Sequence, residues 1–158
     1  MEFLKQIFKF KNMKNLEPEV FSAYAKVVWD GKTGGKIKTR KRSIIKVDMP
    51  KEFRGLDRYP CPDELFISSI AACLLTTFLY FKKKMRLKLL DLSVEGEGKI
   101  SRKADGYKLE GAWFKFTVVT RKRYEKAIMQ CLNLAEEYCH LLNLLPIKAK
   151  VKKTFKFL

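Results

Sequence analysis

Histidine is nearly absent from this chain of 158 residues, and cysteine is scarce. His140 is the only histidine, which excludes a metal site with several histidine ligands. A Ser-His-Asp triad could use no histidine other than His140. The four cysteines (61, 73, 131 and 139) are too sparse for a disulfide scaffold and contain no Cys-x-x-Cys pair. We therefore expect neither a metal site nor a cofactor.

Acidic residues are few relative to basic ones. The chain has 34 Lys and Arg residues against 17 Asp and Glu residues, a net charge of +17 that attracts anions such as nucleic acid, an acidic membrane surface or an anionic substrate. The basic residues cluster in 36–42, in 82–88 and in the last eleven residues, which is typical of solvated strand faces and turns. Nucleic acid is the less favoured partner, because the lysines of "KAKVKKTFKFL" alternate with apolar residues as on one face of a strand.

One long apolar run is present, at residues 65–81. It has 17 positions, the lower limit for a membrane span, and it includes two Ser, two Thr and a Cys. It therefore predicts a buried core helix and no membrane span. The first residues, "MEFLKQIFKFKNMK", are too charged for a secretory signal, and we expect a basic amphipathic extension over 1–18. With cysteines that look unpaired, this pattern predicts a cytoplasmic protein.

The order of predicted elements is ββ-α-ββ-α-β in one domain, residues 19–158. Turn residues in "DGKTGG" and "ADG" and a proline-rich loop over 50–62 separate the elements, and Pro62, Asp63 and Glu64 suit a helix start. The segment 36–42 is expected to cover strand ends and a hairpin tip. The predicted strands are 20–29, 43–49, 89–100, 107–120 and a last one that alternates from Ile147 to Phe155, and the predicted helices are 62–84 and 121–145. This order favours an α+β fold with antiparallel strands.

Two cysteines lie within the predicted helices. Cys73 is about eleven residues into the first helix, and Cys139 is near the end of the second. On composition alone each is better explained as a small core hydrophobe, because a reactive thiol needs a lowered pKa.

Several linked motifs change this interpretation. The segment "PDELFISSIAACLLTTF" resembles the central-helix motif of the OsmC/Ohr family of organic hydroperoxide resistance proteins, and "AEEYCHLLNLLP" is similar to the family's second-cysteine segment. "TGGK" at 33–36 and "PKEFRG" at 50–55 also fit, so the resemblance covers roughly 20–157. It implies antiparallel sheets packed around a long central helix, in an intertwined homodimer with its sites at the subunit interface.

The resemblance also implies an activity, that of a thiol peroxidase acting on organic hydroperoxides or hydrogen peroxide and recycled by a dithiol reductant. Cys73 matches the peroxidatic cysteine, Cys139 the resolving cysteine and Asp63 the catalytic glutamate. The family's thiolate-binding arginine is matched by Arg54, as in OsmC-type members, or by Lys36, as in Ohr-type members.

Residue chemistry agrees with these roles. Peroxide reduction needs a thiolate, and a second thiol must then condense with the sulfenic acid. A thiol in mid-helix gains little from the helix dipole, so an outside cation is required. Asp63 and Cys73 are about 15 Å apart along a straight helix, so a site containing both needs a second chain or an arching loop.

The chain also departs from the family pattern. Aspartate is shorter than glutamate, Lys36 cannot make a forked contact, and His140 stands where the family has proline. The alternative is a non-enzymatic binding protein on the same scaffold, for a small ligand or a polyanion. An inert dimer, with all cysteines as core filler, is a third possibility, and we expect Cys61 and Cys131 to be structural.

Overall fold

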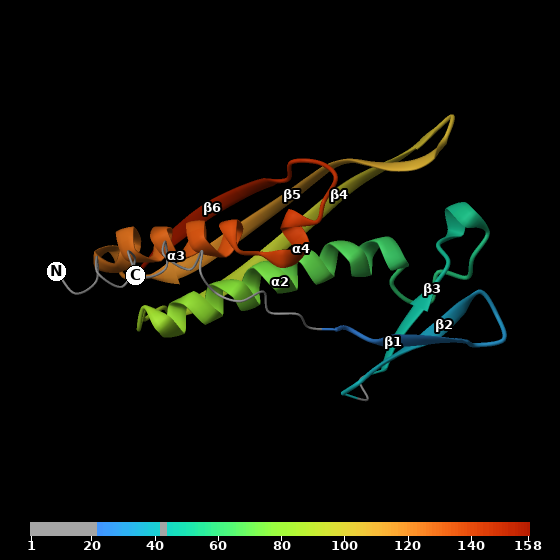
Figure 1. Ribbon diagram of the computed structural model, residues 1–158, viewed down its shortest axis with the longest axis horizontal. Coiled ribbons are helices and arrows are strands. Elements are labelled where there is room, and N and C mark those ends of the chain that lie inside the picture. Colours follow the sequence, from blue (N-terminus) through green and yellow to red (C-terminus); the bar gives the residue numbers. More distant parts are fainter. Residues whose placement is uncertain (1–21, 42–43) are drawn as a thin grey trace. The chain divides into compact units, whose positions relative to one another are not determined.

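The computed structural model describes residues 22–41 and 44–158 of the chain (Figure 1). The predicted extension over 1–18 lies outside the described residues. The chain divides into two compact units, Met1–Pro62 and Asp63–Leu158. We describe each unit by itself.

The N-terminal unit contains an antiparallel sheet of three strands in the order β1-β2-β3. The strands are β1 (Ala25–Trp29), β2 (Gly34–Thr39) and β3 (Ile44–Asp48), followed by a short 3-10 helix, η2 (Lys51–Phe53). Two strands were expected in this region, and the structure has three. The lysines that suggested a hairpin tip alternate with Ile37 along β2, so the segment is a strand whose polar face is basic.

An ion-pair network joins the turn after β1, the end of β3 and the loop before the first long helix. The Arg58 guanidinium donates to Asp48 Oδ2 at 2.6 Å and to Asp30 Oδ2 at 2.7 Å, and Thr33 Oγ1 donates to Asp48 Oδ1 at 2.6 Å. Asp48 is buried, and the Arg58 guanidinium holds the pKa of its carboxyl well below the usual range. The network fixes the loop through contacts within this unit.

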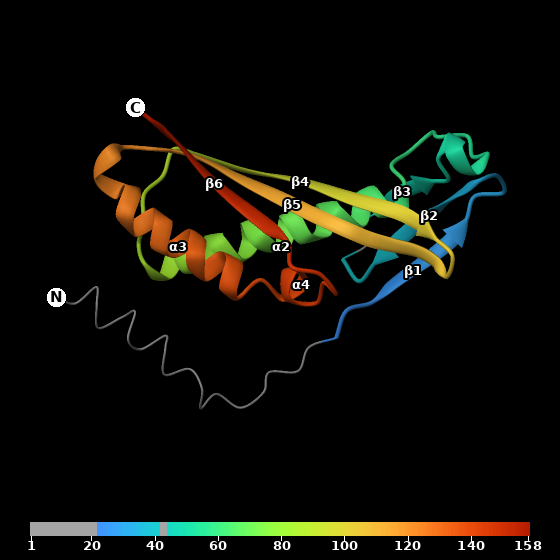
Figure 2. The same cartoon turned by 90° about the horizontal axis from the view of Figure 1, so that it is seen from above.

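The C-terminal unit combines a sheet with helices. Its elements in chain order are α2 (Pro62–Lys84), β4 (Asp91–Lys103), β5 (Gly106–Thr120), η3 (Lys122–Tyr124), α3 (Glu125–Glu137), α4 (His140–Asn143) and β6 (Lys150–Phe157). The sheet order is β4-β5-β6, with β4 and β5 forming a long antiparallel hairpin (Figure 2). The last strand pairs parallel to β5, so the expectation that all strands are antiparallel is wrong for β6. The reason is that α3 carries the chain back along the sheet before β6 begins.

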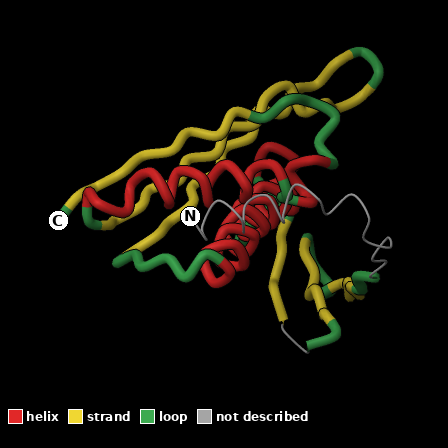
Figure 3. Tube along the Cα trace, turned by 60° about the vertical axis from the view of Figure 1, so that its left-hand side comes forward, coloured by secondary structure: helices red, strands yellow, loops and turns green. Residues whose placement is uncertain are grey.

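The core of this unit lies between the sheet and the helices α2 and α3. These two helices lie on the same face of the sheet and run antiparallel to each other (Figures 1 and 3). Alternate side chains of β5 are buried on that face: Ala112, Phe114, Phe116, Val118 and Thr120. The buried residues of α2 recur at helical spacing: Ile67, Ile70, Leu74, Phe78 and Phe81. The rings of Phe78 and Phe116 are 6.2 Å apart between centroids, and each buried side chain of this size contributes about 1.5–3 kcal/mol.

Gly96 permits the close approach of α2 to β4. A Cβ atom at this position would lie 2.7 Å from Cε1 of Phe114 and 2.9 Å from Cγ2 of Ile67. Both distances are too short for real carbon contacts, so only glycine leaves room for these two side chains.

The remaining surface of α2 is open in the single chain. Phe66, Leu79 and Tyr80 are each at least 43 % exposed. Among the described residues α2 is the one helix whose length and composition would allow it to cross a membrane. We expected α2 to be buried on nearly all sides, but it buries only one stripe of side chains. The prediction that α2 is a core helix and does not span a membrane stays a prediction.

Candidate functional site

Cys73 lies in the middle of α2, beside the stripe that faces the core. Its neighbour Leu74 is fully buried, whereas Cys73 itself is half-buried. The Thr76 hydroxyl donates to the carbonyl oxygens of Cys73 and Ala72 at 3.1 and 2.9 Å. Cys73 is therefore held on a regular helix and is only partly covered by the rest of the chain.

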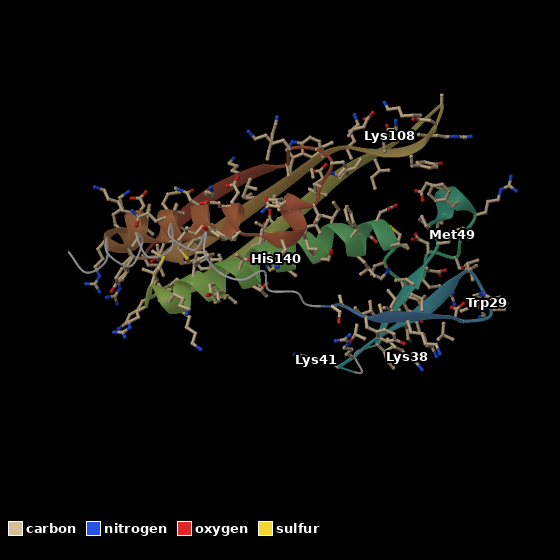
Figure 4. All side chains as sticks on the ribbon, in the orientation of Figure 1. Trp29, Lys38, Lys41, Met49, Lys108 and His140 are labelled. Atoms are coloured by element: carbon tan, nitrogen blue, oxygen red, sulfur yellow. The ribbon has the colours of Figure 1, made fainter. Side chains whose placement is uncertain are left out.

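Cys139 lies at a break between two helices. A single helix was expected over 121–145, but α3 ends at Glu137 and α4 begins at His140, labelled in Figure 4. Cys139 has an extended backbone between them, with φ −71° and ψ 109°. Asn143 secures the break, because its Nδ2 donates to the Glu137 carbonyl at 2.9 Å and its backbone N–H donates to the Cys139 carbonyl at 3.1 Å. The Cys139 side chain is completely buried.

The structure brings Cys73 and Cys139 together, although they are far apart in the sequence. Burial raises the pKa of the Cys139 thiol to about 12, and its hydrogen bond with Cys73 acts in the same direction. The backbone N–H groups of Leu142 and Leu141 favour the thiolate, but burial outweighs them. Cys139 therefore keeps its proton at neutral pH, next to the thiol of the less buried residue Cys73.

The other two cysteines differ from this pair. Cys131 is fully buried, its thiol donates to the Phe78 carbonyl at 3.5 Å, and burial raises its pKa to about 12. Those contacts suit a structural thiol. Cys61 is half-buried and directly precedes α2.

The polar residues predicted for the site lie in both units. Asp63 is exposed in the first turn of α2, ten residues before Cys73 and about 15 Å away along the helix axis. Lys36 is exposed on β2, and Arg54 is exposed after η2 with a left-handed backbone, φ 61°. Both belong to the N-terminal unit, so a cation beside Cys73 stays a prediction.

Sequence reasoning missed the part played by Arg58. This residue is only four positions after Arg54, but it is bound by two carboxylates. Its partners Asp30 and Asp48 are 28 and 10 residues away in the sequence, so no motif spacing marked the network.

Among the described residues, no group of three or more His, Cys, Asp and Glu side chains could hold a metal ion. Within the C-terminal unit, the two neighbouring thiols of Cys73 and Cys139 can form a disulfide with transfer of two electrons.

Known proteins resemble this chain in sequence and in structure. The profile of the OsmC-like protein family matches residues 55–153, and no curated protein matches the chain. An organic hydroperoxide resistance protein of Legionella pneumophila has 22% identity and a TM-score of 0.67, over 88% of this chain and 99% of its own. A hypothetical protein of Aquifex aeolicus has 23% identity and a TM-score of 0.68, and the match covers 88% of this chain and 98% of the Aquifex chain.

A third solved structure is the organic hydroperoxide resistance protein OhrB of Bacillus subtilis, with 19% identity and a TM-score of 0.60 over 87% of this chain and 100% of its own. These likenesses confirm the predicted OsmC-like α+β fold. Because the family profile also covers more than half of the sequence, the chain belongs to the OsmC-like protein family.

Proposed function

We propose that this protein is a thiol peroxidase that reduces organic hydroperoxides or hydrogen peroxide, with Cys73 as the peroxidatic and Cys139 as the resolving cysteine. The observation that carries the proposal is the contact between the thiol of the partly buried Cys73 and the buried, protonated thiol of Cys139. The names of the relatives from Legionella pneumophila and Bacillus subtilis agree with this chemistry.

The reaction has two steps. The Cys73 thiolate attacks one peroxide oxygen, the O–O bond breaks, and the leaving oxygen takes a proton to become an alcohol or water. Cys73 is then a sulfenic acid. The Cys139 sulfur attacks the Cys73 sulfur, the S–O bond breaks and water leaves, which gives a Cys73–Cys139 disulfide. A dithiol reductant returns two electrons to complete the cycle.

The peroxidatic thiolate needs a positive charge nearby, and Arg54 or Lys36 is proposed to supply it. An arginine is the better candidate, because its planar fork can bind the sulfur and a carboxylate at once. Asp63 is proposed as that carboxylate. Both cations belong to the N-terminal unit.

An intertwined homodimer is proposed as the functional state, since it lets one chain complete the site of the other. The exposed apolar residues support this assignment. They include Val27 and Trp29 of β1 and Leu79 and Tyr80 of α2, which a partner chain would cover.

Thiol titration tests the activity. One equivalent of cumene hydroperoxide is expected to remove two free thiols per chain, with a Cys73–Cys139 disulfide found in the peptide map. Cys73→Ser is expected to abolish thiol loss, because it removes the nucleophile. Cys139→Ser is expected to consume one peroxide and to stop at a sulfenic acid that dimedone traps.

Cys131→Ser is the matched control, because Cys131 is a buried thiol outside the pair. It is expected to lose two thiols, as the wild type does. If the wild type keeps all its thiols under these conditions, the protein is no peroxidase, and the binding-protein alternative is favoured.

A further inference from the structure

A cavity lies in the C-terminal unit, where the loop between α2 and β4 meets the junction of β5 and α3. Its volume is about 220 Å³. The loop is tied to the end of β5, because the Leu90 backbone N–H donates to the Val119 carbonyl at 2.9 Å. Neither Cys73 nor Cys139 lines the cavity, so it is separate from the thiol pair.

Thr120 is one of the residues that line this cavity, and its buried hydroxyl has no hydrogen-bond partner among the described residues. Thr120 is 1 % exposed at the end of β5, and its carbonyl accepts the Leu158 N–H at 3.2 Å. A buried polar group without a hydrogen-bond partner has a cost in stability. A molecule in the cavity that hydrogen-bonds to this hydroxyl would remove that cost.

Three cationic side chains surround the same space: Lys88, Arg121 and Arg123. None of them forms a salt bridge with a carboxylate in the described part of the chain, whereas neighbouring Lys122 pairs with Glu125 at 2.7 Å. Arg123 lies over the ring of Tyr124, with 4.9 Å from its guanidinium carbon to the ring centroid. The cavity therefore combines unneutralised positive charge with a buried hydroxyl.

We propose that this cavity binds a small organic phosphate. Arginine forks match the oxygen geometry of phosphate and bind it bidentately, and the Thr120 hydroxyl can donate to a third oxygen. Leu89, Leu90 and the Tyr124 ring supply apolar surface for a short organic group. The volume is below the usual 300–1,000 Å³ of drug-sized ligand sites, so the ligand is small.

Calorimetric titration of the full chain with phenyl phosphate and with inorganic phosphate, at constant ionic strength, tests the proposal. Both are expected to bind, and phenyl phosphate more tightly. Arg121→Gln/Arg123→Gln is expected to weaken binding of both at least tenfold. Thr120→Val is expected to weaken it severalfold, whereas Thr120→Ser, which keeps the hydroxyl, retains it.

The matched control removes two positive charges at the far end of the β4–β5 hairpin, where Figure 4 labels Lys108. Arg102 lies eleven residues along β4 from Asp91, about 36 Å from the cavity end. Arg102→Gln/Lys108→Gln is therefore expected to leave binding unchanged.

If Arg102→Gln/Lys108→Gln weakens phosphate binding as much as Arg121→Gln/Arg123→Gln does, only the net charge of the protein attracts phosphate, and the proposed site is rejected. Absence of binding to the wild type, or binding of a single-stranded oligonucleotide without binding of either phosphate, would reject it as well. The thiol titration is independent, so its outcome leaves this test unaffected.

Discussion

At the scale of a residue, Cys139 and Cys73 show that two identical side chains have different surroundings in this fold. Cys139 is fully buried in the core and the pKa of its thiol is raised, whereas Cys73 on the neighbouring helix is half-buried. A resolving thiol that stays protonated avoids direct oxidation by peroxide, because the thiolate is the reactive form.

The raised pKa predicts a pH dependence for the alkylation of Cys139. At pH 8 a thiol with a pKa of about 12 is ionised to a fraction of about 10⁻⁴, against roughly 0.2 for a free cysteine. We therefore expect iodoacetamide to label Cys139 at least 1,000-fold more slowly than a model thiol at pH 8. Each further unit of pH should raise the rate about tenfold until the protein unfolds.

Mass spectrometry of the alkylated peptides measures the rate, and Cys61, which is half-buried, is the internal reference. Labelling of Cys139 as fast as that of Cys61 at pH 8 would contradict the burial and the raised pKa.

At the scale of an element, the packing of α2 on β4 depends on small residues at defined strand positions. Gly96 faces the Phe114 ring and Ile67, whereas a Cβ atom at Gly98 would meet the end of the Ile67 side chain at 2.5 Å. A flexible side-chain end can move aside more easily than a buried ring can. The two glycines are therefore expected to tolerate substitution differently.

Gly96→Ala is expected to reduce the free energy of unfolding by about 1–3 kcal/mol, because the added methyl group overpacks the core. Gly98→Ala is the matched control and is expected to cost less, since the Ile67 side chain can change its rotamer. Urea unfolding followed by circular dichroism measures both variants. An equal loss in the two, or a larger loss for Gly98→Ala, would show that Gly96 is not the tight contact.

At the scale of the whole molecule, apolar side chains are left uncovered in each unit when a single chain is considered. Val27 is 62 % and Trp29 73 % exposed in β1, and Tyr80 is 50 % exposed in α2. Large apolar side chains that a single chain leaves exposed in each unit are ones that an interface would cover. This supports the proposal of a dimer.

Light scattering after gel filtration is expected to give a mass of about twice 18.5 kDa at 0.15 M salt. Leu79→Glu/Tyr80→Glu is expected to shift the protein to a monomer, because it places two charges on the exposed side of α2. Lys83→Glu/Lys84→Glu, at two exposed positions near the end of the same helix, is the control for added negative charge. A monomeric wild type would exclude the dimer.

Much of the fold could be predicted from local patterns. The start of α2 at Pro62, the β4–β5 hairpin and the position of Cys73 on a helix follow from apolar periodicity and turn residues near one another in the sequence. β2 was not predicted, because the run of basic residues suggested a hairpin tip and only Ile37 marks the apolar alternation of a strand. The break at Cys139 could not be foreseen, since no glycine or proline marks it.

The sequence by itself determined the long helix α2, the β4–β5 hairpin, the membership of the OsmC-like family and which cysteines to consider, because these depend on residue types at short and regular spacings. Only the tertiary structure decided that the sulfurs of Cys73 and Cys139 meet, that β6 runs parallel to β5, and that the Thr120 hydroxyl is buried without a hydrogen-bond partner in the described part of the chain. The physical reason is that pairing between distant segments, and the burial that shifts a pKa, arise from side-chain packing across the whole unit.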